Sequence, residues 1–161
     1  MNLLKFINKL DLKEKVRDIK SKSKRIVFTN GCFDIIHAGH VDYLEKAKTL
    51  GDLLIVGVNS DSSVKKIKDH GRPIVKEEYR LKVLDSIGPI DHIILFDEET
   101  PLELIKELKP DVLVKGADWK DKGVVGEDIV KSYGGKVELI ELLPGISTSS
   151  IIEKILKTYA D

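Results

Sequence analysis

Two histidines, His37 and His40, lie on either side of Gly39 at the start of an expected helix. In the first turn of a helix, free backbone N–H groups and the helix dipole favour a bound anion. Glycine has no side chain, so a ligand can approach the backbone closely here. The spacing therefore predicts a phosphate site with two imidazole donors. The alternative is that one or both histidines only cap and pack the start of the helix.

The same pair could instead form half of a metal site, because histidines three residues apart can share a metal ion. The surrounding segment offers only Cys32 and Asp34 as further candidate ligands. We therefore expect no metal ion bound by protein side chains. His70 and His92 have no supporting pattern and are expected to be structural or on the surface.

Four consecutive hydroxyl residues at positions 147–150 follow Pro144 and Gly145 and precede an apolar helical pattern. Ser150 and Glu153 have the spacing of a capping box, in which two side chains satisfy free backbone N–H groups. A cap requires one hydroxyl, and four exceed that need. The run therefore predicts a second phosphate-binding helix N-terminus. Its candidate residues are Gly145, Ser147, Thr148 and Ser149.

A third polar segment, residues 115–119, follows another expected strand. It is either a strand end that runs into a turn, anchored by Trp119, or the border of a nucleobase or phosphate site. Cations in or after the long loop at residues 62–76 are further candidates for polyphosphate or substrate, although isolated surface cations are usually solvated. These cations are Lys68, Arg72 and Arg80.

The elements that must position these residues alternate along the chain. Short apolar runs of strand length are separated by helical patterns, which is typical of a parallel sheet covered on both faces. Strands are expected at residues 25–29, 53–59, 92–96, 112–115 and 136–142, and helices at 40–50, 77–87, 101–109, 125–133 and after Pro144. We predict a Rossmann-like, doubly wound α/β fold with five strands. Ligands of such sheets bind beyond the carboxyl ends of the strands, where the polar segments fall.

Length and composition limit the classes of function. The chain has 161 residues, with 27 basic and 27 acidic side chains, so no net charge favours nucleic acid or an anionic membrane as the main partner. No apolar run approaches the roughly 20 residues of a membrane span. The single cysteine, Cys32, allows no intrachain disulfide, and we expect a cytoplasmic protein. We expect an N-terminal helical extension at residues 1–24 and one catalytic domain at residues 25–161.

The chain resembles the cytidylyltransferase-like nucleotidyltransferases. Residues 31–34 with residues 37–40 are similar to the first signature of that superfamily, which contains an HxGH motif, and residues 145–149 resemble the second. With residues 59–61, 72–73 and 115–119, the ordered set looks most like the D-glycero-β-D-manno-heptose 1-phosphate adenylyltransferases. Many of these are fused to a sugar kinase domain, for which this chain has no room, so the stand-alone form is expected.

The resemblance implies transfer of AMP from ATP to heptose 1-phosphate, giving pyrophosphate and ADP-heptose for lipopolysaccharide core synthesis. It assigns His37 and His40 to charge stabilisation on the nucleotide phosphates. Backbone groups of Cys32 and Phe33 are expected to line the nucleotide, and Asp34 to order the loop. The remaining expected contacts are Gly39, Gly145, Ser147, Thr148 and Ser149 with the nucleotide phosphates, Lys115 and Asp118 with the ribose or base, and Lys68, Arg72 and Arg80 with the sugar phosphate or polyphosphate.

Mg²⁺ is expected to accompany ATP, because it neutralises triphosphate charge and prefers phosphate and water ligands to a protein cage. A homodimer is common in the superfamily, but no residue pattern identifies an interface.

Three alternatives stay open. A glycerol-3-phosphate cytidylyltransferase shares both signatures but normally carries an arginine shortly before the second, where this chain has Leu142 and Leu143. An FAD synthetase-like nucleotidyltransferase is another. A non-catalytic nucleotide sensor would be expected to lack a histidine or the hydroxyl run, and this chain has both. One departure concerns Lys68, because the adenylyltransferase pattern places Lys-Gly shortly before Arg-Pro, and Asp69 follows Lys68 here.

Overall fold

A parallel sheet with strand order β3-β2-β1-β4-β5 forms the centre of the molecule. The computed structural model describes residues 2–68 and 70–160. Its strands are β1 (Ile26–Gly31), β2 (Leu53–Asn59), β3 (His92–Phe96), β4 (Val112–Gly116) and β5 (Lys136–Ile140). The chain winds outward from β1 to β3 and then crosses to β4, so strand order reverses between β1 and β4. The predicted doubly wound, Rossmann-like fold is confirmed.

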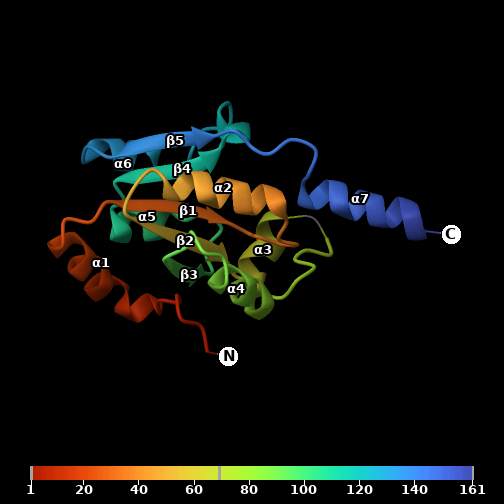
Figure 1. Cartoon of the computed structure of the whole chain (residues 1–161), viewed down its shortest axis with the longest axis horizontal. Coiled ribbons are helices and arrows are strands. Elements are labelled where there is room, and N and C mark those ends of the chain that lie inside the picture. The colour runs from red at the N-terminus through yellow and green to blue at the C-terminus, as the bar shows by residue number, and fades with distance from the viewer. Residues whose placement is uncertain (1, 69, 161) are drawn as a thin grey trace.

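Helices pack on both faces of this sheet (Figure 1). The helices α2 (Ala38–Lys48) and α4 (Glu77–Asp85) contribute to the hydrophobic core on one face. On the other face the core is built from α1 (Leu12–Ser21), α5 (Leu102–Leu108) and α6 (Glu127–Ser132). Alternate residues of β2 enter opposite cores, which explains why its apolar run is nearly continuous.

The N-terminal segment is part of the same packed unit as the sheet. The backbone of Ile7 donates to the carbonyl of Ile93 in β3, and Ile93 donates to Lys5, both at 2.9 Å. This pairing covers β3, which lies at the edge of the sheet. The helix α1 then buries Leu12, Val16 and Ile19 in the core. The expected boundary between residues 1–24 and 25–161 stays a prediction, but the two parts share one core.

The expected long loop at residues 62–76 is partly wrong, because a short helix, α3 (Asp61–Ile67), occupies its first half. The side chain of Ser60 caps this helix by accepting from the N–H of Ser63. Periodicity did not reveal α3 because its only buried apolar residue is Val64. The remaining loop passes close to the carboxyl end of β1, where Asp34 holds it.

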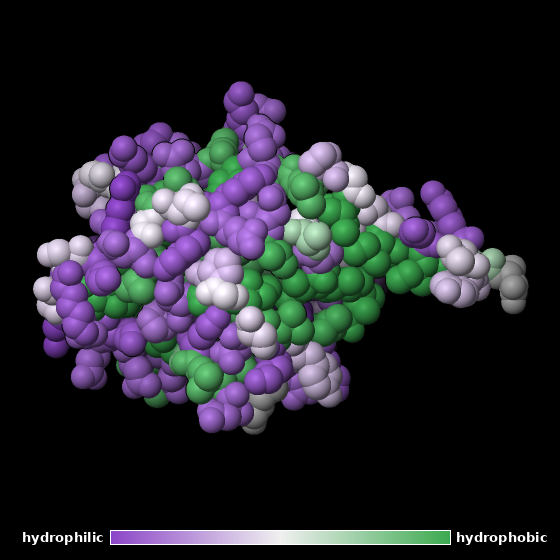
Figure 2. All heavy atoms as spheres, in the orientation of Figure 1, coloured by the Kyte–Doolittle hydropathy of each residue, from purple (hydrophilic) through white to green (hydrophobic). Residues whose placement is uncertain are grey.

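The last helix, α7 (Thr148–Tyr159), differs from the others because none of its residues is buried. It projects from the body at one end of the molecule (Figure 1). Its apolar side chains Ile155, Leu156 and Tyr159 are exposed, and hydrophobic atoms continue from the body onto this helix (Figure 2). In residues 2–68 and 70–160, no helix has the length and apolar character needed to cross a membrane.

Candidate active site

The first half of the site forms where β1 passes into α2. His37 is the N-cap residue of α2, with extended backbone, and Gly39 and His40 lie in the first turn. A Cβ on Gly39 would lie 3.1 Å from the His37 ring, so glycine allows the ring to fold over the helix start. The two imidazole rings lie with their centroids 4.0 Å apart. The structure thus brings both predicted histidines together at one helix N-terminus.

Hydrogen bonds fix which nitrogen of each imidazole faces outward. The backbone N–H of Gly39 donates to Nδ1 of His37 at 3.1 Å, and the N–H of His37 donates to Nδ1 of His40 at 3.3 Å. Since both Nδ1 atoms accept hydrogen bonds, the neutral rings carry their proton on Nε2. Each histidine therefore offers an Nε2–H donor to a ligand. The histidines cap the helix as well, so the structural and functional interpretations both apply.

Burial keeps these histidines uncharged without ligand. It lowers the pKa of His40 to about 4, with a smaller contribution from the neighbouring His37. Burial also lowers the pKa of His37 below its ordinary value. Both rings are then neutral hydrogen-bond donors at neutral pH. A phosphate bound against them would raise both pKa values, because a nearby negative charge favours the imidazolium form.

The second half of the site forms at the start of α7. Ser147 is its N-cap residue, and Ser147 and Ser150 satisfy each other's backbone N–H groups at 3.0 and 2.9 Å. Thr148 donates its hydroxyl hydrogen to the carbonyl of Asp34 at 2.7 Å. The cap thus uses two hydroxyls rather than the one expected. Gly145 forms a turn with φ of +83° just before the helix and does not line the cavity.

Asp34 connects the two halves to a third segment. Its buried carboxylate accepts hydrogen bonds from Arg72 Nε at 2.5 Å and from the N–H groups of Ile74 and Val75 at 2.8 and 2.9 Å. Burial opposes its charge, but these donors and the Arg72 guanidinium hold the pKa of Asp34 below its usual value. Because its carbonyl also accepts from Thr148, Asp34 joins the β1–α2 loop, the loop before α4 and the start of α7.

The structure contradicts the role expected for Arg80. Arg80 is only 1% exposed and does not line the cavity. Its guanidinium donates to the carbonyls of Cys32 and Val75 and to the carboxylate of Asp61. The expectation that Arg80 binds a substrate phosphate is therefore wrong in this structure. These hydrogen bonds hold the β1–α2 loop against α4, so the guanidinium is not available to a ligand in the cavity.

The other two cations lie at the loop before α4. Arg72 pairs with Asp34 and borders a separate hollow of about 480 Å³. Lys68 lines both this hollow and the main cavity. It is exposed, and its charge acts on Cys32, whose thiol has a pKa raised by burial. Of the three predicted phosphate-binding cations, only Lys68 thus reaches the main cavity.

Lys115 and Asp118 form the wall of the cavity at the end of β4. Lys115 is 7% exposed, donates from Nζ to the carbonyl of Asn30 at 3.1 Å and lies 5.0 Å from the centre of the Trp119 ring. Burial lowers the pKa of Lys115 to about 8. A Cβ on Gly116 would lie 2.5 Å from Oδ1 of Asp118, so glycine is needed for that side chain to fold back.

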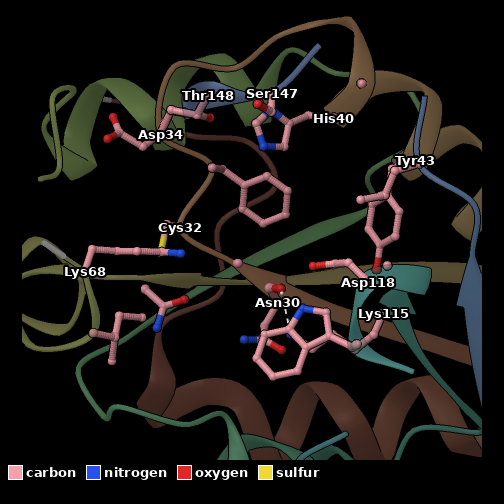
Figure 3. A pocket seen from close by; sticks show the side chains of 18 of the residues that line it. Asn30, Cys32, Asp34, His40, Tyr43, Lys68, Lys115, Asp118, Ser147 and Thr148 are labelled. Carbon is pink, nitrogen blue, oxygen red and sulfur yellow. Dashed lines mark hydrogen bonds between the residues drawn. The ribbon is translucent and has the colours of Figure 1, made fainter. Parts of the chain in front are cut away.

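These segments enclose one cavity of about 530 Å³, within the range of small-molecule sites. Figure 3 shows His40, Ser147 and Thr148 on one side, with Asn30, Lys115 and Asp118 on another. It lies at the carboxyl edge of the sheet, as predicted. The predicted site residues that line it are Cys32, Phe33, Asp34, His37, Gly39, His40, Lys68, Lys115, Asp118, Ser147, Thr148 and Ser149.

Several lining residues were assigned no role by the sequence analysis, although Asn30 and Asn59 lie in polar segments that it noted. Asn30 and Asn59 lie at the ends of β1 and β2, and Tyr43 lies on α2 with its hydroxyl 2.8 Å from that of Thr29. Residues 99–101 follow β3. A polar residue at the carboxyl end of a parallel strand was the available signal for the two asparagines. Residues 99–101 carry no motif, and only the strand order places them at the cavity.

The donor set of the site is suited to phosphate rather than to a caged metal ion. Within residues 2–68 and 70–160, no three histidine, cysteine, aspartate or glutamate side chains cluster as metal ligands would. Two helix N-termini and neutral imidazole donors face the cavity instead. Such a site fits a Mg²⁺ ion that keeps phosphate and water as its ligands and arrives with a nucleotide.

Comparison with known proteins identifies relatives over most of the chain. Residues 28–154 match the family model described as cytidylyltransferase-like. The bifunctional protein HldE of Syntrophotalea carbinolica is 51% identical over 97% of this chain and 33% of that protein. The HldE of Campylobacter jejuni subsp. doylei is 56% identical over 94% of this chain and 34% of its own length. The chain therefore spans about a third of the length of these curated relatives.

Solved structures share the fold. A lipopolysaccharide core biosynthesis protein from Thermoplasma volcanium is 29% identical, with a TM-score of 0.60 over 74% of this chain and 97% of that chain. A pantoate-beta-alanine ligase from Francisella tularensis, complexed with a form of ATP and beta-alanine, gives a TM-score of 0.60 at 14% identity over 97% of this chain and 78% of that one. The second comparison supports the architecture alone.

Proposed function

We propose, from the premise that this chain belongs to the cytidylyltransferase-like family of nucleotidyltransferases, that it transfers AMP from ATP to D-glycero-β-D-manno-heptose 1-phosphate. The products are ADP-heptose and pyrophosphate. The observation that carries the proposal is the convergence of two helix N-termini on one cavity, with His37 and His40 at one and Ser147 at the other. Identity of more than half to HldE proteins over most of the chain supports it.

The chemistry is substitution at the α-phosphorus of ATP. A phosphate oxygen of heptose 1-phosphate forms a new P–O bond, and the bond from the α-phosphorus to the bridging oxygen of pyrophosphate breaks. The attacking oxygen is already ionised at neutral pH, so no base has to remove a proton from it. The protein's contribution is then to position both substrates and to stabilise charge on the transferring and leaving phosphates.

His37 and His40 supply donors for that charge. Their Nε2–H groups face outward because both Nδ1 atoms are bonded to backbone N–H groups. Donors held in place before the reaction stabilise the transition state without reorganisation. As negative charge accumulates, each neutral ring can strengthen its hydrogen bond or take up a proton. We assign both histidines to the α-phosphate and the leaving pyrophosphate.

The remaining contacts divide between the ends of the cavity. At α7, the free N–H groups of the first turn and the hydroxyl of Ser149 are assigned to the β- and γ-phosphates, since Ser147 and Thr148 already have hydrogen bonds. Lys115 and Asp118 are assigned to the ribose or base, and Lys68 to the sugar phosphate. Backbone groups of Cys32, Phe33 and Gly39 line the space between, and Gly145 acts through the turn before α7.

Mg²⁺ bound to ATP would neutralise part of the triphosphate charge. The side chains assigned to the triphosphate, His37, His40 and Ser149, are hydrogen-bond donors rather than carboxylates, which fits an ion that the nucleotide itself carries. The chain's own part is to leave room for the hydrated ion and to hold the phosphate oxygens that it leaves unliganded.

A second candidate is a cytidylyltransferase, because the family takes its description from that activity. Against it, Leu142, Leu143 and Pro144 precede Gly145, where the glycerol-3-phosphate enzymes carry an arginine. The test measures pyrophosphate release with each nucleoside triphosphate against heptose 1-phosphate and glycerol 3-phosphate. We expect release with ATP and heptose 1-phosphate. A preference for CTP, or no release with heptose 1-phosphate, would overturn the proposal.

We also propose that the chain works as a homodimer in the cytoplasm. The apolar side of α7 is exposed in the single chain, with Leu156 59% and Tyr159 80% exposed. Sedimentation equilibrium of the wild type and of a Leu156→Asp variant tests the assembly. A monomeric wild type contradicts it, and a dimeric variant excludes this helix as the interface.

A further inference from the structure

Asn59 is a buried polar residue that faces the cavity and takes no part in the assignments above. It is the last residue of β2 and only 2% exposed. Its Nδ2 donates to Oγ of Ser63 at 2.9 Å, and Oγ of Ser63 donates to the carbonyl of Glu98 at 2.7 Å. Ser63 itself is fully buried, and the hydrogen bond at the far end of this chain, to Glu98, is partly buried.

The hydrogen-bond chain fixes the orientation of the Asn59 amide. A serine hydroxyl has one hydrogen, and that of Ser63 goes to the Glu98 carbonyl. Ser63 can then only accept from Asn59, so Nδ2 must face Ser63 and Oδ1 must face away from it. None of the described residues donates a hydrogen bond to this Oδ1. Asn59 therefore presents a fixed acceptor at the cavity wall.

The surroundings of Asn59 suit the acceptor sugar rather than the nucleotide. Together with Lys68 and residues 99–101, Asn59 lines the part of the cavity that lies over β2 and β3. Lys115 and Asp118 come from the other side of β1, at β4. Figure 3 shows Lys68 across the cavity from Asp118 and Tyr43. Asn59 thus lies on the same side of β1 as Lys68, the cation assigned to the sugar phosphate, and on the opposite side from the nucleoside wall.

We propose that Asn59 determines acceptor specificity by accepting a hydrogen bond from a hydroxyl group of the sugar phosphate, an inference that rests on the proposed function. A site built around a fixed acceptor discriminates against a substrate that lacks the matching donor, because the buried oxygen is then left unpaired. Ser63 is a positioning residue in this arrangement. It acts on the substrate only through the orientation of the Asn59 amide.

The test compares Michaelis constants for the two substrates in the full chain. We expect Asn59→Ala to raise the KM for heptose 1-phosphate about tenfold while the KM for ATP changes less than about twofold. Ser63→Ala keeps the amide but frees it to rotate, so the KM for the sugar phosphate should rise about threefold. Ser62→Ala, on the exposed side of α3, is the matched control and should change neither constant.

Deoxy analogues of heptose 1-phosphate, each lacking one hydroxyl, test the contact without altering the fold. For the wild type, one analogue should show a KM about tenfold above that of the parent sugar. In Asn59→Ala, the same analogue and the parent should have equal KM values. Wild-type activity combined with an unchanged sugar KM in Asn59→Ala would overturn this inference alone. A wild type inactive with heptose 1-phosphate would overturn the proposed function and this inference with it.

Discussion

The helices α2 and α7 begin with the same capping geometry but differ in how the fold supports them. In each, the N-cap side chain accepts a backbone N–H and the third helical residue bonds back to the N-cap N–H. Residues of α2 such as Leu44 and Ala47 are fully buried against the sheet, whereas α7 buries none. The comparison teaches that local capping chemistry sets the direction of the donors, and tertiary packing sets how firmly they are held.

This difference suggests a division of labour between the two helix starts. A short helix without packed residues is only marginally stable in water. The donors of α2 are therefore held in place before any ligand binds, while those of α7 depend on the contact between Thr148 and Asp34 and on the ligand itself. We expect substitutions at α2 to affect the chemical step and substitutions at α7 to affect nucleotide binding.

The largest effect on activity is expected at the start of α2, which is packed against the sheet. His40→Ala should lower kcat about a hundredfold or more, the scale for loss of a donor to transition-state charge. His40→Asn, whose amide oxygen can still accept the N–H of His37, should keep the helix cap but not the activity. Steady-state kinetics and circular dichroism check both variants, with His92→Gln in β3 as the control. Near-wild-type turnover in a folded His40→Asn variant would refute the assignment.

The next largest effect is expected at Asp34, which connects the start of α2 to the start of α7. Asp34→Asn removes the charge that pairs with Arg72 in a buried position, and it should lower the free energy of unfolding by about 2–3 kcal/mol. Urea denaturation measures this loss. Asp18→Asn is the control, since Asp18 and its partner Lys22 are both exposed and such pairs contribute little to stability. Equal losses in both variants would show that Asp34 does not connect the segments.

A smaller effect is expected at the projecting helix. Thr148→Val removes the hydroxyl that bonds to the Asp34 carbonyl, so the KM for ATP should rise about fivefold, with kcat nearly unchanged. Hydrogen exchange should become faster in α7 and stay the same in α2. Thr158→Val, at the other end of the helix, is the matched control, because its hydroxyl bonds only within α7. A fall in kcat without a change in KM would contradict the division of labour.

A further effect concerns the dependence of stability on pH. Burial lowers the pKa of His40 from about 6.5 to about 4, so the unfolded chain binds more protons than the folded one between these values. The stability of the folded protein is therefore expected to fall as pH drops from about 6.5 towards 4. His40→Asn should show a shallower fall in urea denaturation over this range. An identical pH dependence in both proteins would show that His40 is not kept neutral by the fold.

Much of the site could be predicted because its residues follow one another in the chain. His37, Gly39 and His40 lie within one helical turn, and their spacing alone indicates a capped, anion-binding start. The hydroxyl residues that begin at Ser147 are also consecutive in the chain, and they indicate a second helix start of this kind. The strands β1 to β4 were also predictable, since burial on both faces leaves nearly continuous apolar runs, whereas β5 lies at the edge of the sheet and buries only Ile140.

Contacts between distant segments could not be predicted in this way. Arg80 was expected at a phosphate, but its guanidinium reaches Cys32 and Asp61 inside the protein. No local sequence pattern distinguishes an arginine that binds substrate from one that holds a loop in place. Asn59 shows the opposite case, because no role was predicted for it from the sequence. Its amide is oriented as an acceptor by a chain of hydrogen bonds through Ser63 to Glu98.

The sequence by itself determined the elements other than α3, the parallel sheet and the two helix starts suited to phosphate, because these depend on local periodicity and capping. Only the tertiary structure decided which cations face the cavity, which nitrogen of each histidine is available and how differently α2 and α7 are held. Those properties come from burial and from hydrogen bonds between segments up to 114 residues apart, as between Asp34 and Thr148. No local sequence pattern predicts such contacts, because the order of the strands in the folded sheet decides which distant segments lie together.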